Sequence, residues 1–211
     1  MRRTTRAAAA TAALATVLAV SACGQSSQPA GGAAAGKAGA PTGSVQAGAT
    51  DTQAFNDADV TFATQMIPHH ASAIQMADMA LSQTSNAEVK RLATSIKDAQ
   101  SPEIETMSAW LKGWGKPVPA MTGQDMGSMG SMASGSMSSQ EMAALGKAGG
   151  GAFDTLWLES MIKHHRSAVT MAQTELASGR SAEAKQLAQQ IVDSQSKEIT
   201  EMTSLLATLK K

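Results

Sequence analysis

The chain has 211 residues, with 17 basic and 17 acidic side chains, so its formal net charge is zero. No excess of positive charge indicates a nucleic-acid partner. One cysteine cannot form a disulfide within the chain, and any metal site would have to use His, Met or carboxylate ligands. Because Tyr is absent and Phe and Trp total six, the expected core consists of Ala, Leu, Ile and Met packed between helices.

The first 22 residues have the pattern of a signal peptide. Three arginines lie among the first six residues and precede an uncharged stretch, 7–22, which is too short to span a membrane well. Val20-Ser21-Ala22-Cys23 resembles a bacterial lipobox, in which the cysteine is lipidated. Ordinary cleavage is the alternative, but it would leave an exposed thiol in an oxidising compartment. We therefore expect an extracytoplasmic protein that is anchored to the cell membrane through Cys23.

The mature chain divides into a tether and one folded domain. Residues 23–51 consist mostly of Gly, Ala, Ser, Gln and Pro, which offer too few large apolar groups to offset the entropy of ordering, so a flexible tether is predicted. Helical periodicity begins near residue 52 and continues, with one long break, to residue 211. The sequence thus predicts a single domain over 52–211.

An internal repeat organises this domain. When the chain is shifted by 95 residues, 59–111 aligns with 154–206 without a gap, and 23 of the 53 aligned positions are identical. A repeat of this length is a whole supersecondary unit, and a unit that cannot bury its apolar face alone packs against its copy. Repeat one is assigned to 55–115 and repeat two to 152–211.

Each repeat is predicted to be a helical hairpin. The expected helices cover about 55–84 and 87–113 in the first repeat, and 152–178 and 182–209 in the second. Four antiparallel helices predict an all-α, ferritin-like four-helix bundle.

Turn residues set the expected ends of these helices. Ser85 or Asn86 is the expected N-cap of the second helix, whereas Gly179 and Ser181 separate the last two. Pro68 and Pro102 fall inside predicted helices, where they should kink the helix without reversing the chain. The alternative for Pro68 is that it begins a new helix at its first turn.

The segment 116–151 between the repeats has a different composition, with six of the 14 methionines spread among Gly and Ser. It is either a linker with incidental methionines or a flexible thioether clamp for Cu(I) built on Met126, Met129 and Met132. We favour the clamp because Met is uncommon in polar linkers.

Both repeats carry a His-His pair followed six residues later by Met. On a helical wheel His70 lies near the middle of the buried face of the first helix, whereas His69 and Met76 lie together on its edge and Met79 lies farther outward. The two neighbouring histidines are therefore expected to have different roles.

Two polar residues fall on the buried stripe of the second helix in each hairpin. Gln100 and Glu103 recur as Gln195 and Glu198. A buried carboxylate needs a partner, and the facing imidazole of His70, or of His165 in the second repeat, is the expected one. Such a pair would fix the tautomer of a metal-binding histidine.

Imidazole and thioether ligands together favour Cu(I), and its analogue Ag(I), over magnesium or calcium. His69 and Met76 are two turns apart, about 10 Å along the axis, so further ligands are required. The candidates are Met66, Met79 and residues of another helix, with Met161 as the repeat counterpart of Met66. A core histidine that is satisfied by glutamate, with no metal, is the simpler alternative.

These residues resemble the "domain of unknown function 305" family. The recurring pattern is Met-Ile-x-His-His followed by Met-Ala, then Gln-x-x-Glu-Ile-x-x-Met on the next helix, and this sequence carries it twice. The resemblance implies a ferritin-like bundle and, as in some members, copper and silver binding outside the cytoplasm in support of copper tolerance. It implicates as metal ligands His69, His70, Met76, Met79, His164, His165 and Met171. Thr174 replaces the counterpart of Met79, so a weaker second site is expected.

Three functions remain open at this point. The first is a non-catalytic lipoprotein that sequesters Cu(I) or passes it to an exporter or another copper protein. The second is a ferritin-like di-metal oxidase using Asp59, Glu103, His70 and their repeat counterparts, although the Glu-x-x-His pairs of such enzymes are missing. The third is a helical interaction module without metal. The oligomeric state is also open, and a homo-oligomer in which two chains exchange hairpins is one form of it.

Overall fold

The repeated hairpins form helices whose ends lie within two residues of the predicted ones. The computed structural model describes residues 54–120 and 137–211, and the signal peptide, Cys23, the tether and Met126, Met129 and Met132 lie outside these ranges. Within the described ranges the regular structure is helical throughout: α1 (Asp57–Gln83), α2 (Ala87–Gly113), α3 (Ser139–Lys147), α4 (Gly150–Ser178) and α5 (Ala182–Leu209). The all-α prediction is confirmed. No helix in this part of the chain is long and apolar enough to cross a membrane.

Four of the five helices in the described ranges begin at side chains that accept hydrogen bonds from free backbone N–H groups, and α4 begins at Gly149 without such a cap. Asn56 accepts hydrogen bonds from the N–H groups of Ala58 (2.9 Å) and Asp59 (3.1 Å), and the Asp59 carboxylate accepts from the N–H of Asn56 in return. Asn86 caps α2 and Ser181 caps α5, as predicted. Such caps contribute about 1 kcal/mol each.

The two internal prolines do not end their helices. α1 continues through Pro68 and α2 through Pro102, so the expected absence of chain reversals is confirmed. Their repeat counterparts are Lys163 and Lys197, which lie in the equally continuous α4 and α5.

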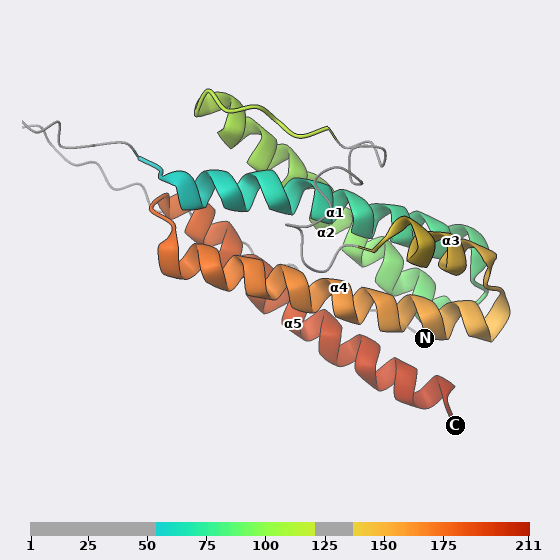
Figure 1. The fold of residues 1–211 in the computed structure, drawn as a ribbon. Coiled ribbons are helices and arrows are strands. Elements are labelled where there is room, and N and C mark those ends of the chain that lie inside the picture. Colours follow the sequence, from blue (N-terminus) through green and yellow to red (C-terminus); the bar gives the residue numbers. More distant parts are fainter. Residues whose placement is uncertain (1–53, 121–136) are drawn as a thin grey trace, which may run out of the picture. The chain divides into compact units, whose positions relative to one another are not determined.

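α1 and α4 lie side by side and run in opposite directions, with α2 packed on α1 and α5 packed on α4 (Figure 1). Two apolar clusters fill the interior, and each contains residues of both repeats. The Trp157 cluster, which includes Met76, Phe153, Trp157 and Met161, lies toward the start of α4. The Phe62 cluster, which includes Phe62, Met66, Met107 and Leu111, contains the residues near the start of α1. The repeats therefore bury their apolar faces against each other, as predicted.

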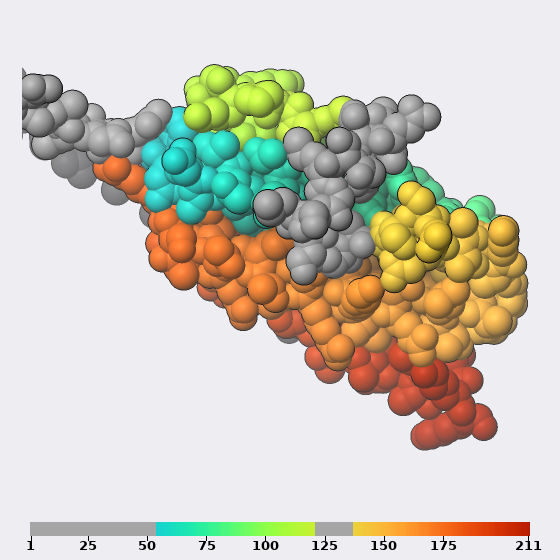
Figure 2. All heavy atoms as spheres, viewed as in Figure 1, coloured from blue at the N-terminus to red at the C-terminus, as the bar shows by residue number. Residues whose placement is uncertain are grey.

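α3 differs from the prediction, because it lies within the segment 116–151, whose composition predicts a linker or a flexible clamp. Ser138 accepts a hydrogen bond from the N–H of Glu141 (3.2 Å), and the Glu141 carboxylate accepts from the N–H of Ser138 (2.8 Å), which is a capping box. Its apolar residue Leu145 is fully buried. Figure 2 shows α3 on the surface where α1 and α4 meet, near the start of α4.

Candidate metal centre

His69 and His164 face each other between α1 and α4. Their ring centroids are 3.6 Å apart, with an angle of 37° between the ring planes. The two residues are 0% and 1% exposed, and neither nitrogen of either ring has a hydrogen-bond partner. Because they are repeat counterparts, the pair lies where the two halves of the domain meet.

His70 and His165 point the other way, toward the outer helices. His70 Nε2 lies 2.6 Å from Glu103 Oε2, and His165 Nε2 lies 2.8 Å from Glu198 Oε2. The imidazole–carboxylate pair predicted from the wheel is therefore present in both repeats. When Nε2–H donates to the carboxylate, Nδ1 keeps a free lone pair, and Nδ1 of both histidines is buried without a partner.

Burial keeps the inner imidazoles neutral. The pKa of His69 is lowered well below its usual value, first by burial and then by the nearby His70 and His165. Burial likewise lowers the pKa of His164, with neighbouring histidines, His69 first, adding to the effect. A neutral imidazole has the lone pair that a metal ligand requires, so these residues need no deprotonation before they bind at neutral pH.

The wheel placed His69 on the edge of the buried face, and this was wrong. His69, Met76 and His164 are all buried completely or almost so. The buried arc of α1 is wider than one facing helix would produce, because α1 packs against both α2 and α4. His70 is directed toward α2 and His69 toward α4, which explains why adjacent histidines are both internal.

The predicted methionines differ in burial. Met66 and Met161 are fully buried, and each precedes an inner histidine by three residues, a spacing that puts side chains on the same helical face. Met79 and Met171 are half-buried. Gln100 and Gln195 are also internal, and the Gln100 amide has no partner at either polar atom.

The chemistry of these side chains fits a soft metal ion better than a hard one. Six imidazole nitrogens in the bundle interior lack partners, whereas buried polar groups are normally paired. In the described part of the chain, no three His, Cys, Asp or Glu side chains are grouped as a metal site. Metal binding here would therefore need thioethers beside the imidazoles, and that combination favours Cu(I).

The two aspartates that the oxidase hypothesis requires lie at the ends of the bundle. Asp59 accepts hydrogen bonds from the N–H groups of Arg180 (3.1 Å) and Ser181 (2.9 Å). Its counterpart Asp154 accepts from the hydroxyl of Thr84. Asp59 precedes His70 by eleven residues, about 16 Å along a helix. These carboxylates tie helix ends to turns and do not join the imidazoles.

Glu175 was missed by the sequence reasoning, because its repeat counterpart is Ala80 and no pattern marks it. The residue is 1% exposed. Burial, reinforced by the Asp59 carboxylate, raises the pKa of Glu175 to about 8, against a smaller lowering effect of Lys185. Gly179 follows one turn later and ends α4 with a negative φ. A Cβ on Gly179 would collide with the Glu175 carboxyl group, which explains the glycine.

We expect Glu175→Gln to remove a pH dependence of stability. Because the folded-state pKa of Glu175 lies above its usual value of 4.5, its contribution is complete below about pH 4.5 and is lost as pH rises toward and through 8. The variant should match the parent at pH 5 and exceed it at pH 9 by about 1 kcal/mol or more, since one pKa unit is about 1.4 kcal/mol. Urea unfolding at pH 5, 7 and 9 measures this, and parallel pH profiles for the two proteins would contradict it.

Comparison with known proteins identifies the family to which the chain belongs. The family model "Domain of unknown function (DUF305)" matches residues 59–206. A DUF305 protein from Streptomyces coelicolor, inferred to be secreted, has a solved structure with 34% identity and a TM-score of 0.64, covering 72% of this chain and 94% of that one.

Structures of the protein CopM with bound metal are also similar. Its Cu(II)-bound form has 37% identity and a TM-score of 0.60, and covers 71% of this chain and 96% of that one. A silver-bound form has 33% identity and a TM-score of 0.59, with 71% and 95% coverage. Curated proteins give no significant match. The repeated His-His motifs, the helical bundle and the family match over 59–206 together show that this chain is a member of the DUF305 family.

Proposed function

We propose that this protein binds Cu(I), with Ag(I) as an analogue, through the imidazoles and thioethers between its two hairpins. The observation that carries the proposal is the facing pair His69 and His164, whose four ring nitrogens are buried and unpartnered. Leaving polar groups in this state costs stability, which a bound metal ion would recover. The copper-bound and silver-bound forms of CopM support the same chemistry.

In this proposal His69 and His164 are the central ligands. His70 and His165 lie beside this pair, with ring centroids 6.4 Å from those of His69 and His164, and are held in orientation by Glu103 and Glu198. Sulfur ligands come from the four methionines nearest in sequence to the histidines, Met66, Met76, Met161 and Met171. Met79 belongs to the first repeat alone, because Thr174 takes its place in the second.

The proposed role is storage or transfer of copper outside the cytoplasm, without catalysis. A relative that is inferred to be secreted supports the location. Lipidation at Cys23 would hold the domain at the membrane, near a copper exporter or another copper protein that could receive the ion. The folded domain would bind copper without a thiol ligand, since the one cysteine of the chain is Cys23.

Anaerobic titration of the full chain with Cu(I) against a competing chelator tests the proposal. We expect binding that survives the chelator in the parent protein and is lost in a variant with His69, His164, Met76 and Met171 all changed to Leu. These replacements conserve volume approximately, so the fold should persist, and circular dichroism checks that it does. Equal, weak binding by both proteins would refute the proposal.

A further inference from the structure

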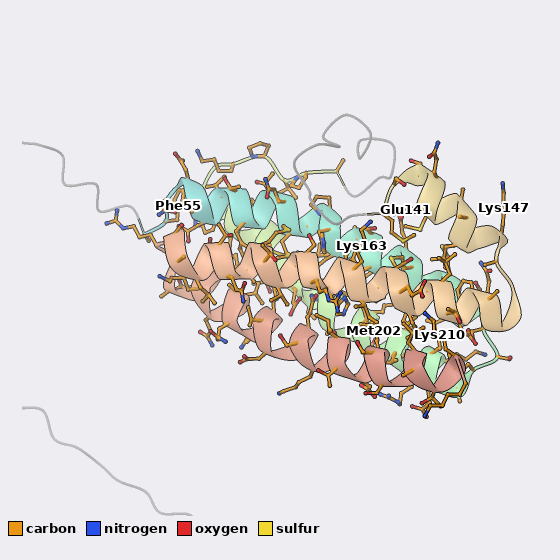
Figure 3. All side chains as sticks on the ribbon, turned by 60° about the horizontal axis from the view of Figure 1, so that its bottom comes forward. Phe55, Glu141, Lys147, Lys163, Met202 and Lys210 are labelled. Carbon is orange, nitrogen blue, oxygen red and sulfur yellow. The ribbon has the colours of Figure 1, made fainter. Side chains whose placement is uncertain are left out.

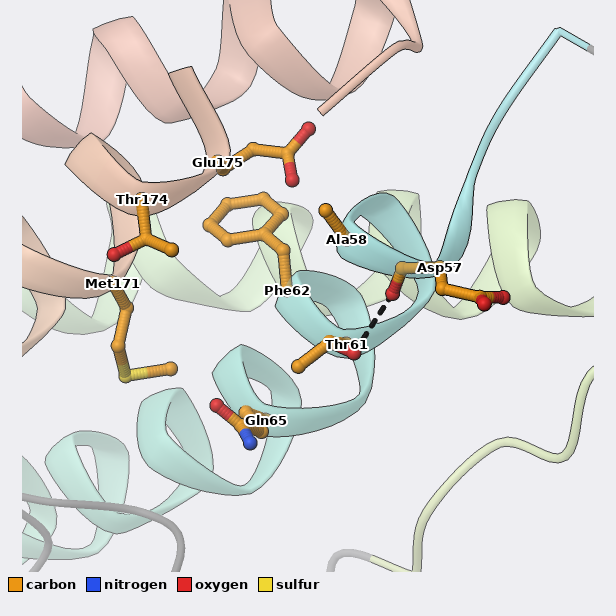
Figure 4. Close-up of a pocket in the computed structure, with 8 residues that line it drawn as sticks. All are labelled: Asp57, Ala58, Thr61, Phe62, Gln65, Met171, Thr174 and Glu175. Carbon is orange, nitrogen blue, oxygen red and sulfur yellow. Dashed lines mark hydrogen bonds between the residues drawn. The ribbon is translucent and has the colours of Figure 1, made fainter. Parts of the chain in front are cut away.

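The two ends of the α1–α4 interface are related by the repeat but differ in filling. At the open end, near the start of α1, a pocket of about 330 Å³ lies between α1 and α4, with Phe62 on one side and Met171 on the other (Figure 4). At the closed end the counterpart of Phe62 is Trp157, which is fully buried in one cluster with Leu145 of α3. α3 closes this end, and no comparable helix of the described residues lies over the open one.

Three aromatic rings are stacked on one another at the open end. The ring centroids of Phe55 and Trp114 are 4.7 Å apart with 15° between the planes, and those of Trp110 and Trp114 are 6.0 Å apart with 21° between the planes. Phe55 lies just before α1, whereas the tryptophans lie at the end of α2. All three residues are half-buried. We call this surface, formed by Phe55, Trp110 and Trp114, the Trp114 stack.

Core packing alone does not account for tryptophan at these positions. Trp110 and Trp114 pack against the Phe62 cluster but keep part of their surface exposed. The shift of 95 residues puts Leu205 and Leu209 in their places at the closed end. The indole N–H of Trp157 donates to a backbone carbonyl, whereas neither indole N–H of the stack has an acceptor among the described residues. Rings with an apolar body and a free polar edge are typical of the lipid–water interface.

Two lysines flank the stack. Lys112 and Lys116 are exposed, and neither forms an ion pair within the described part of the chain. Basic side chains beside apolar rings attract an anionic lipid surface. Asp57, in the first turn of α1, is exposed at the same end, so the electrostatic attraction is modest and the rings must supply most of the affinity.

The chain enters the folded domain at this surface. Phe55 is the second described residue, and Figure 3 shows it at the opposite end of the bundle from Lys147 and Lys210. The predicted tether, 23–51, would therefore join a lipid on Cys23 to the Trp114 stack. A flexible chain of this length spans roughly 30 Å, which gives the stack an effective concentration at the membrane on the order of millimolar. A weak contact is then enough to dock the domain.

We propose that the Trp114 stack, with Lys112 and Lys116, is a membrane-docking surface that holds the open end of the bundle against the lipid–water interface. The partner is the membrane that carries the anchor: the rings lie at the level of the headgroups and the lysines contact anionic headgroups. The inference rests on the lipid anchor in the proposed function and is independent of copper binding. Docking in this way points the closed end, with α3, away from the membrane.

Fluorescence of the lipidated full chain tests the proposal, because the chain has three tryptophans and the third is buried at the other end. The vesicles contain phosphatidylcholine and phosphatidylglycerol in equal parts, with brominated lipids that quench indoles in contact with the membrane. Trp157→Phe leaves the stack as the reporter, and Trp110→Phe with Trp114→Phe leaves Trp157. We expect the emission of the stack to be quenched and shifted to shorter wavelength, and the emission of Trp157 to be unaffected.

Charge reversal provides the matched comparison. In the Trp157→Phe background, Lys112→Glu with Lys116→Glu should lower the ratio of docked to undocked protein about ten-fold or more, since each lysine near an anionic surface contributes about five-fold. The control Lys147→Glu with Lys211→Glu changes two exposed lysines at the closed end and should leave the quenching unchanged. Equal effects of the two pairs would show that the open end is not the docking surface.

Two further outcomes would overturn the inference, and they differ in what they say about the proposed function. If the lipidated protein sediments with vesicles but the Trp114 stack is quenched no more than Trp157, the docking surface is wrong and the lipid anchor stands. If the chain expressed with its signal peptide is not lipidated and does not sediment with vesicles, the anchor and the docking surface both fail. Cu(I) titration of the same samples tests copper binding separately, and a thermal melt shows whether each variant is folded.

Discussion

Replacing His69 and His164 together by Leu should make the metal-free protein more stable and abolish its stabilisation by Cu(I). The four orphaned ring nitrogens disappear in this variant, and an unsatisfied buried polar group costs about 1–3 kcal/mol. Leu fills a comparable volume, so the packing between α1 and α4 should survive. The parent protein should gain about 2.7 kcal/mol at a Cu(I) concentration 100 times its dissociation constant. Thermal unfolding with and without Cu(I) measures both effects.

The outer histidines provide the matched control. His70→Leu with His165→Leu leaves the Glu103 and Glu198 carboxylates, which are 17% and 18% exposed, without their imidazole partners. This variant should be less stable than the parent, in contrast to the inner pair. If replacing the inner pair destabilises the metal-free protein as much as replacing the outer pair does, and Cu(I) still stabilises it, the assignment of His69 and His164 as metal ligands is wrong.

Trp157→Ala should be among the most destabilising single substitutions in the bundle, at about 3–5 kcal/mol. The indole is fully buried, and its N–H donates to the backbone carbonyl of Met76 at 2.8 Å. The substitution therefore leaves a cavity and removes the hydrogen bond from the indole to this helical carbonyl group. Urea unfolding at pH 7 gives the free energy difference.

Phe62→Ala is the comparison that the repeat supplies. Phe62 is the counterpart of Trp157, but it borders the pocket at the open end and has no polar atom to hydrogen-bond. Its loss should cost at least about 1 kcal/mol less than the loss of Trp157, because the cost of a cavity depends on what surrounds the site. Equal costs for the two substitutions would mean that α3 adds little to the closed end.

Much of the fold follows from local signals in the sequence. The helix bounds follow from caps such as Asn86 and Ser181, because free N–H groups at a helix start need nearby acceptors. The internal repeat predicted that the two hairpins pack on each other, because one hairpin cannot bury its apolar face alone. The His70–Glu103 pair followed from helical periodicity, since a buried carboxylate requires a partner on the facing helix.

α3 was predictable but overlooked. Ser138 and Glu141 have the spacing of a capping box and precede the apolar Leu145. The surrounding Gly, Ser and Met composition is typical of a loop, whereas the capping box and Leu145 indicate a helix. A helix of nine residues is marginal in isolation, so its stability depends on burying Leu145 against the bundle.

The sequence by itself determined the two hairpins, their family and the residue types able to bind soft metal. Only the tertiary structure decided that His69 meets His164, that Glu175 is buried beside Asp59, and that the ends of the α1–α4 interface differ. The physical reason is that periodicity describes one face of one helix, whereas α1 packs against two helices at once. Which side chains meet across such an interface depends on how helices from distant parts of the chain are placed together.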